Sequence, residues 1–250
     1  MVMRKLLLWL AIGVFWCLAS VVKAAPIAVS QAWFDWDRLQ IQTISFGSQP
    51  LTITWNTNDE DVWVSAYEEY QSDSAPDWTT PLNVSAAWGG ASASAAMDSQ
   101  KMEVYSASGM GSDNPAHAFA GRYGEFTVSG TGVVVFSLPY HVEVTLSDAP
   151  EGTNANAGVD AWLYLGTNDE IRNTRSDAGL WKSLVVDGPG SWSDDGILVV
   201  ALYFNDGEGG YFEAGLDSDT YASSPVPLPS ALFLLGGGLL GVAGCRKLKV

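Results

Sequence analysis

The amino-acid sequence predicts an all-β protein, an antiparallel β-sandwich of the jelly-roll type, built from residues 25–224. Three observations lead to this fold class. Apolar and polar residues alternate with period two in many short runs, Gly, Asn, Asp and Pro separate these runs, and no 15-residue stretch of the body has a helical period. We expect about ten strands in a single domain, because no linker-like segment divides the body.

Residues 1–24 precede this body and are predicted to be a secretory signal peptide. Two basic residues near the start are followed by a continuous apolar stretch at 6–22. Val22 and Ala24 then occupy the positions at which signal peptidases require small or tolerated residues, so cleavage is expected between Ala24 and Ala25. The alternative is an uncleaved N-terminal membrane anchor.

The first strands are expected at 39–43, 51–55 and 62–67, where apolar and polar residues alternate. Each should bury one face and expose the other, as in an antiparallel sheet. The sequence Thr-Asn-Asp-Glu occurs at 57–60 and again at 167–170, each time just after a run of this kind. Two interpretations stay open, a duplicated sheet or the ordinary preference of Asn and Asp for turns.

Residues 71–115 are dominated by Ser, Ala, Gly and Asp. One interpretation is a mobile loop, and the other is a set of strands whose inward residues are alanine. Ala and Ser alternate within 91–96, and residues 101–108 alternate as well. A structureless loop of this length is improbable in a compact domain, which favours the strands.

The longest alternating run covers residues 134–146, in which every even position is apolar or aromatic and is expected to form the buried face. The turn sequence Ser-Gly-Thr-Gly at 129–132 precedes it and predicts a hairpin with the strand before. Pro139 has no N–H group to donate to a ladder, which indicates an edge strand, a bulge or a corner at which two strands meet.

The last strands are expected at 159–165 and 211–216, the latter following the turn sequence Asn-Asp-Gly at 205–207. Between them, residues 197–204 are continuously apolar. Such a run is typical of a strand that is buried on both faces.

The segment 225–250 has a different character. Residues 225–229 read Pro-Val-Pro-Leu-Pro and favour a stiff, extended and exposed conformation, because proline fixes φ and lacks an N–H group. A single transmembrane helix is predicted at 229–245, with a length of about 26 Å, the short limit for a membrane span. The chain then continues with three basic residues that should stay cytoplasmic, with the body on the other side of the membrane. These residues are Arg246, Lys247 and Lys249.

This arrangement resembles the PEP-CTERM protein-sorting tail of Gram-negative bacteria, which combines a short Pro-containing motif, one membrane helix and a basic cluster. The residues that match the motif are Val226, Pro227, Leu228 and Pro229. Leu228 stands where the family usually has Glu. The resemblance implies an exported protein that an exosortase-like enzyme recognises and processes, first anchored in the inner membrane and then at the cell surface or outside the cell. A plain single-pass anchor is the alternative.

The body is strongly acidic. All 28 acidic residues lie within 35–219, whereas six of the 12 basic residues lie in the two terminal segments, so the body has a net charge of −22. Such a body would repel a phosphate backbone, which excludes nucleic-acid binding. Calcium is the best cofactor candidate, because acidic clusters occur at expected turns, although none has EF-hand spacing. Its candidate ligands are Asp59, Asp61, Asp194 and Asp195, and the alternative is that cations merely screen the charge.

Enzymatic activity is not expected. The two cysteines, Cys17 and Cys245, lie in the terminal segments, and the two histidines, His117 and His141, are too few for a three-histidine zinc site. His141 should lie on the solvated face of its strand. The sequence contains no Gly-x-Ser-x-Gly motif, and with so many carboxylates a glycosidase-like pair is expected by chance alone.

Tryptophan is the last notable feature. Trp33, Trp36, Trp63 and Trp162 fall beside polar or outward strand positions, where exposed rings can stack against sugars. Two functions are therefore considered, a non-enzymatic surface or matrix protein associated with exopolysaccharide or biofilm, and a carbohydrate-binding module assisted by calcium. A secreted hydrolase is the third alternative, and no motif supports it.

Overall fold

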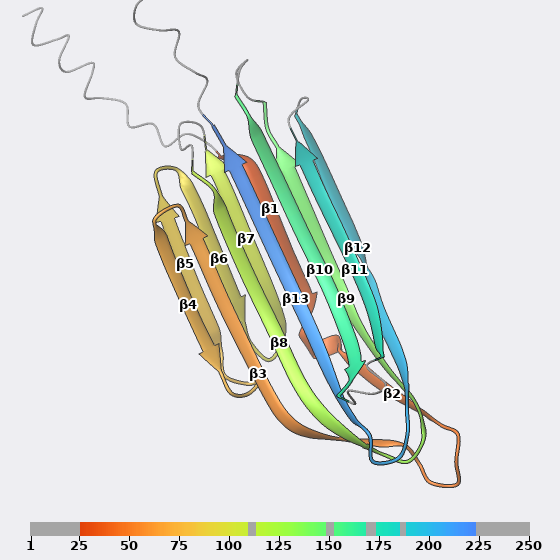
Figure 1. The fold of residues 1–250 in the computed structure, drawn as a ribbon. Coiled ribbons are helices and arrows are strands. Elements are labelled where there is room, and N and C mark those ends of the chain that lie inside the picture. The colour runs from red at the N-terminus through yellow and green to blue at the C-terminus, as the bar shows by residue number, and fades with distance from the viewer. Residues whose placement is uncertain (1–25, 110–113, 149–152, 169–173, 186–188, 224–250) are drawn as a thin grey trace, which may run out of the picture.

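The computed structural model describes residues 26–109, 114–148, 153–168, 174–185 and 189–223. These residues form two antiparallel β-sheets that pack face to face, which confirms the predicted β-sandwich (Figure 1). The predicted signal peptide and the predicted sorting tail lie outside the described residues. Within them, no helix is long and apolar enough to cross a membrane.

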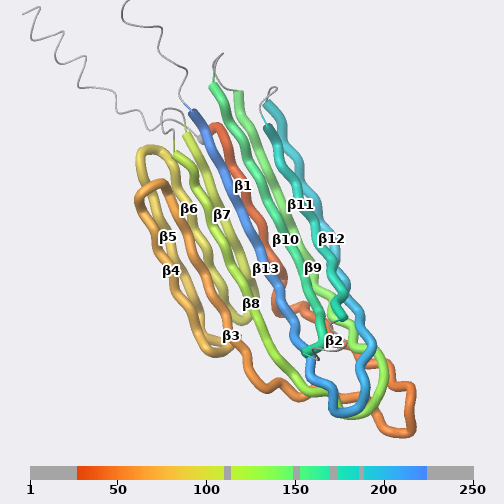
Figure 2. The backbone as a smooth tube through the Cα atoms, in the orientation of Figure 1, coloured from red at the N-terminus to blue at the C-terminus, as the bar shows by residue number. Residues whose placement is uncertain are grey.

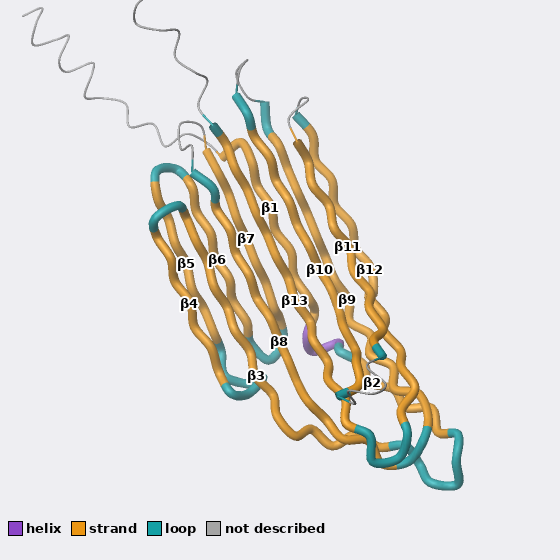
Figure 3. The backbone as a smooth tube through the Cα atoms, viewed as in Figure 1, coloured by secondary structure: helices purple, strands orange, loops and turns teal. Residues whose placement is uncertain are grey.

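The described chain contains thirteen strands and one short 3₁₀-helix. They are β1 (Pro26–Asp35), η1 (Trp36–Arg38), β2 (Gln40–Ser45), β3 (Thr52–Ala66), β4 (Glu69–Ala75), β5 (Leu82–Trp88), β6 (Ala91–Met97), β7 (Lys101–Gly109), β8 (Ala116–Ser129), β9 (Gly132–Leu146), β10 (Ala155–Thr167), β11 (Arg175–Val185), β12 (Gly190–Phe204) and β13 (Gly209–Ala222). Figure 3 shows that loops occupy only the strand ends.

Sheet A has the strand order β12-β9-β1-β7-β6-β5, with β2 also paired to β9, and sheet B has the order β11-β10-β13-β8-β3-β4. The beginning of β1 and the end of β13 lie at the same end of the sandwich, whereas β2 lies toward the opposite end (Figure 2). The strands outnumber the eight of a simple jelly roll. The connections β3–β4, β5–β6–β7 and β10–β11 are hairpins that widen each sheet.

The described residues of the small-residue segment 71–115 form strands, as favoured above. They supply β4 at the edge of sheet B and the meander β5–β6–β7 in sheet A. In β6, Ala91, Ala93 and Ala95 are buried, and the residues between them face outward. Alanine thus provides an apolar inner face here, although the segment has few large apolar residues.

The core lies between the inner faces of the two sheets. Val134, Phe136 and Leu138 of β9 are fully buried, as the alternation predicts. The ring of Phe136 stacks on that of Phe212 in β13, with centroids 4.4 Å apart. This contact joins the two sheets through apolar and aromatic packing.

A buried ion pair interrupts the apolar core. Arg122 of β8 and Glu60 of β3 are directly opposite each other, and Arg122 Nε donates a hydrogen bond to Glu60 Oε2 at 2.7 Å. Arg122 Nη2 donates to the Asp98 carbonyl oxygen at 2.8 Å, and the guanidinium carbon lies 4.3 Å from the Trp36 ring centroid. Arg122 therefore connects sheet B to η1 and to the turn before β7.

Buried hydroxyl groups join the sheets at a second place. Ser218 Oγ in β13 donates to the Ser30 carbonyl oxygen in β1 at 3.0 Å and lies 2.7 Å from Ser106 Oγ in β7. Ser108 and Thr220 repeat this contact, with their hydroxyl oxygens 3.1 Å apart. Each hydroxyl has a partner in the other sheet, as buried polar groups require.

The prediction that strand 197–204 is buried on both faces is wrong. This stretch belongs to β12, the edge strand of sheet A, and Ile197 and Val199 are 60% and 51% exposed. A continuous apolar run indicates only that both faces of the strand carry apolar side chains. Whether a second layer covers the outer face depends on how the sheets are arranged.

Pro139 lies in a strand with neighbours on both sides. β9 pairs with β12 along its whole length without a register shift, so it is neither an edge strand nor bulged there. On its other side, β9 pairs with β2 over residues 132–137 and with β1 over residues 140–146. Pro139 therefore lies where the ladder on that side passes from one partner to the other, a place where a missing N–H group is tolerated.

The stretch at 57–60 is not a turn. It continues β3, after a register shift between Trp55 and Thr57. At 167–170, only the first two residues are described, and Thr167 is the last residue of β10. The repeated Thr-Asn-Asp-Glu sequence therefore marks no common turn in the described chain.

Candidate functional site

The outer face of sheet B carries a row of aromatic side chains that we call the aromatic ladder. Its members, in the order of contact from β4 through β3 and β8 to β10, are Tyr70, Trp63, Phe119, Trp162 and Tyr164. Successive ring centroids are 6.3, 5.7, 6.0 and 6.4 Å apart. Trp63, Phe119, Trp162 and Tyr164 alternate with buried residues on their strands and therefore point away from the core. Tyr70, on the edge strand β4, is 62% exposed.

Glycine residues allow the rings to lie over the sheet. β13 runs between β8 and β10, and its Gly215 is directly opposite Trp162. A Cβ atom at Gly215 would lie 2.2 Å from the Trp162 ring, and one at Gly121 would lie 2.8 Å from the Phe119 ring. The rings occupy the space of the missing side chains, and in this way Trp162 reaches across β13 to Phe119.

Among the residues that the structure describes, eight carboxylates share this outer face with the ladder. They are Asp59, Asp61, Glu125, Asp160, Asp177, Glu213, Asp217 and Asp219. Asp217 is directly opposite both Asp160 and Phe119. His117 Nε2 lies 2.7 Å from Asp217 Oδ1, and the guanidinium carbon of Arg175 lies 3.5 Å from the Tyr164 ring centroid.

Burial and mutual repulsion perturb several of these groups. Burial raises the pKa of Asp61, Asp160 and Asp219, and neighbouring carboxylates raise it further in each case. Burial alone would lower the pKa of His117, but its hydrogen bond to Asp217 and the surrounding negative charge outweigh burial and raise it. The face therefore favours positive charge.

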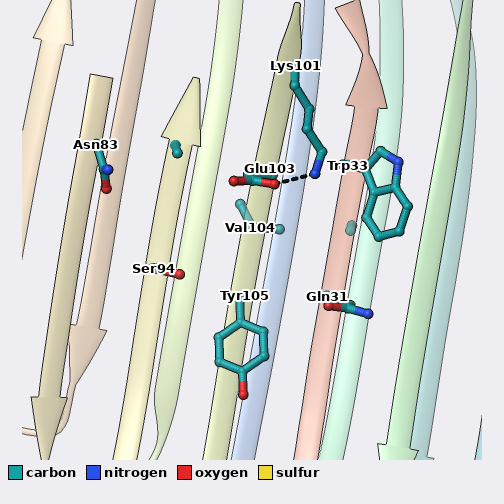
Figure 4. Close-up of a pocket in the computed structure, with 10 residues that line it drawn as sticks. Gln31, Trp33, Asn83, Ser94, Lys101, Glu103, Val104 and Tyr105 are labelled. Carbon is teal, nitrogen blue, oxygen red and sulfur yellow. Dashed lines mark hydrogen bonds and ion pairs between the residues drawn. The ribbon is translucent and has the colours of Figure 1, made fainter. Parts of the chain in front are cut away.

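The outer face of sheet A is hollowed above β1, β6 and β7. The hollow has a volume of about 300 Å³. Figure 4 shows its labelled side chains, with Ser94 of β6 lying between Asn83 on one side and Tyr105 on the other. Small residues on β6 thus separate larger polar and aromatic side chains on the neighbouring strands.

The tryptophan beside this hollow already has close partners. Trp33 stacks on His141 from the β9 side, with ring centroids 3.8 Å apart, and Lys101 Nζ approaches from the β7 side to 4.7 Å from the Trp33 centroid. Lys101 pairs with Glu103, and His141 Nδ1 lies 2.7 Å from Asp195 Oδ1. Polar partners therefore surround Trp33, and each of the two side chains against its ring also contacts a carboxylate.

The four tryptophans expected at a sugar-stacking surface do not share one face. Trp63 and Trp162 belong to the aromatic ladder, and Trp33 lies on the outer face of the opposite sheet. Trp36 is only 8% exposed and packs in the core against Arg122, so it cannot present a ring to a ligand. His141 faces outward as expected, but contacts leave its side chain only 16% exposed.

The four aspartates predicted as calcium ligands are not brought together. Asp59 and Asp61 lie on sheet B, whereas Asp194 and Asp195 lie on β12 of sheet A. The Tyr140 hydroxyl donates to Asp194 Oδ2 at 2.6 Å. Across the described ranges, no group of three or more His, Cys, Asp or Glu side chains is arranged to hold a metal ion.

Three ladder members, Tyr70, Phe119 and Tyr164, were not identified as candidates by the sequence. The outward positions of Phe119 and Tyr164 follow from the same alternation that identifies the buried residues beside them, whereas β4 shows no such alternation at Tyr70. The strand order and register that place them beside Trp63 and Trp162 are long-range properties. No local sequence signal contains this information.

Comparison with protein-family models gives one match. Residues 225–247 match the PEP-CTERM protein-sorting motif, and this segment includes the predicted motif at 226–229. No curated protein matches the chain. The match confirms the resemblance stated from the sequence and covers the C-terminal region, outside the sandwich. The chain therefore carries a PEP-CTERM protein-sorting motif, which implies export and sorting by an exosortase-like system.

Proposed function

We propose that the sandwich is a non-enzymatic protein of the cell surface or extracellular matrix, and that it binds polysaccharide through the aromatic ladder of sheet B. The observation that carries this proposal is the continuous row of ring contacts from Tyr70 to Tyr164. Aromatic rings bury a large apolar area at small entropic cost, and sugar rings offer flat faces of matching character.

The shape of the face favours a polymer as the ligand. The ladder crosses the sheet from β4 to β10, a distance of about 19 Å for strands about 4.8 Å apart. It lies on an open sheet face that a chain can cross in either direction. Binding along such a row would recognise several successive sugar units and would not require a chain end.

The sorting motif supports the setting of this function. The motif implies export with a membrane-anchored precursor. This supports the proposal that the sandwich acts outside the inner membrane and meets exopolysaccharide there. Processing at the Pro motif predicts an exported protein that begins at Ala25 and ends near residues 227–229. Mass spectrometry of the exported fraction tests this, and recovery of peptides containing Lys249 would contradict it.

Binding is tested with the exported protein and a panel of soluble polysaccharides, using affinity electrophoresis and tryptophan fluorescence. Trp162→Ala and Trp63→Ala should each weaken binding at least tenfold while leaving the circular-dichroism spectrum unchanged. Trp33→Ala is the matched control, because it removes a tryptophan from the other outer face. Equal affinities for all three variants and the parent protein would rule out the ladder as the binding surface.

A further inference from the structure

The charged side chains around the aromatic ladder indicate which charge its ligand carries. The eight carboxylates of this face outnumber its two basic side chains, His117 and Arg175, within the described residues. Arg175 lies over the ring of Tyr164, and His117 is bound to Asp217. The face is therefore negative at the points where a ligand on the ladder would lie.

Several of these carboxylates lack a cationic partner. In the described part of the chain, Asp61, Asp160 and Asp219 form no ion pair within 4.0 Å. Each has other carboxylates near it, which raise its pKa in addition to the effect of burial. For Asp219, the charge of His117 directly opposite on β8 acts against this rise. Bringing a cation to this face would relieve repulsion that the folded protein otherwise retains.

These carboxylates lie beside the rings. Asp217 on β13 is directly opposite Phe119 on the neighbouring strand β8. Asp160 is two residues before Trp162 on the same face of β10. On the other side, Asp61 is two residues before Trp63 on β3. A sugar stacked on either tryptophan would therefore have a carboxylate next to its substituents.

We propose that the polysaccharide carries free amino groups, as in a partly or fully de-N-acetylated hexosamine polymer. The inference rests on the proposed function, since it takes the ladder to be the binding surface. The rings contact the flat faces of the sugars, and the ammonium groups pair with the unpaired carboxylates. An anionic chain would instead be repelled, and a neutral chain would gain only the stacking contacts.

The experiment compares four probes with the exported protein by isothermal titration calorimetry at slightly acidic pH. They are a glucosamine oligomer, the N-acetylglucosamine oligomer of equal length, a neutral glucan, and alginate with and without calcium. The glucosamine oligomer should bind at least tenfold more tightly than its acetylated counterpart. This difference should shrink as salt is added, because exposed charge pairs are screened.

A double variant tests whether the preference for the amine-bearing oligomer depends on the carboxylates of the outer face of sheet B. Asp61→Asn together with Asp160→Asn should reduce the preference for the amine-bearing oligomer to less than threefold, because it weakens binding of that oligomer much more than binding of the acetylated one. The control is Glu103→Gln together with Glu143→Gln, which removes the same charge from the outer face of sheet A. The control should keep the full preference.

The outcomes separate the two proposals. Equal affinity for the amine-bearing and acetylated oligomers would overturn the charge inference and leave polysaccharide binding in place. Tighter binding of alginate, with or without calcium, would overturn it as well. Failure of every probe to bind would reject the proposed function itself, and the inference with it.

Discussion

The two sheets of this sandwich follow the same alternating pattern but present different outer surfaces. On sheet A, Trp33 is flanked by His141 and Lys101, and the charged neighbours pair with one another. On sheet B, the rings contact one another above glycine positions, and most of the carboxylates beside them form no ion pair with any residue that the structure describes. Alternation therefore determines that a side chain faces outward, and cross-strand neighbours determine whether it is available to a ligand.

The inner faces differ in a corresponding way. Among the described residues, the buried charged side chains are Arg122 and Glu60, and both belong to sheet B. The buried polar side chains of sheet A are mainly hydroxyl groups, such as Ser30, whose Oγ donates to the Gly158 carbonyl oxygen, and Ser106, whose Oγ contacts Ser218 Oγ across the core. Each of the following predictions tests one side of this comparison against the other.

The largest effect is expected at the buried ion pair. Arg122→Leu leaves Glu60 buried without its partner and should lower the free energy of unfolding by about 3–5 kcal/mol, measured by urea denaturation. Replacing both residues by Leu should recover most of the loss. Arg38→Leu, which breaks the exposed pair with Asp35, should cost less than about 1 kcal/mol. Similar losses for the two arginine variants would show that burial does not determine the cost.

The second prediction concerns the glycine beneath the ladder. Gly215→Val should displace the Trp162 ring and weaken polysaccharide binding at least tenfold, or about 1.4 kcal/mol. Gly179→Val is the control, because a Cβ there would meet its nearest atom at an ordinary 3.4 Å. The test is to measure the polysaccharide affinity of both variants. Unchanged affinity of the Gly215→Val protein would contradict a binding role for the Trp162 ring above Gly215.

A smaller effect is expected at the hydroxyl contacts between the sheets. Ser218→Ala removes the partner of Ser106 and should lower the free energy of unfolding by about 1–2 kcal/mol. Ser94→Ala, on the outer face of sheet A, should change it by less than about 0.5 kcal/mol. Chemical denaturation of both variants tests the difference. Equal stabilities would mean that water satisfies the hydroxyl group left behind.

The smallest effect is a pH dependence that comes from His117. Burial would lower its pKa, but the hydrogen bond to Asp217 and the charges of Asp217 and Asp219 raise it overall. Its contribution to stability is therefore fully present below the unfolded pKa of about 6.5 and is lost as the pH rises through the higher folded pKa. An NMR titration should find this raised value, and His117→Asn should remove the corresponding step from stability measured against pH. A folded pKa below that of the unfolded chain would contradict this prediction, because the contribution of His117 to stability would then be lost as the pH falls.

Much of the fold could be predicted because period-two alternation is a local signal. The alternation at 134–146 identified the buried positions of β9, and the alternation of Ala and Ser at 91–96 identified β6 although that stretch contains no large apolar residue. The same signal could not reveal that β12 lies at a sheet edge, where Ile197 remains exposed. Nor could it reveal that Arg122 is buried, because its neutralising partner Glu60 lies on another strand.

The sequence by itself determined the fold class and the sorting signal. Both depend on patterns within short stretches of chain, namely the spacing of apolar residues along a strand and the order of Pro motif, apolar segment and basic residues in the C-terminal region. Only the tertiary structure decided which outer face is a candidate binding surface. The ladder requires Trp63, Phe119 and Trp162, which lie on three strands, to contact one another in a row, with the Trp162 ring above Gly215 on a fourth strand. That meeting depends on strand order and register, which long-range pairing establishes and no local pattern encodes.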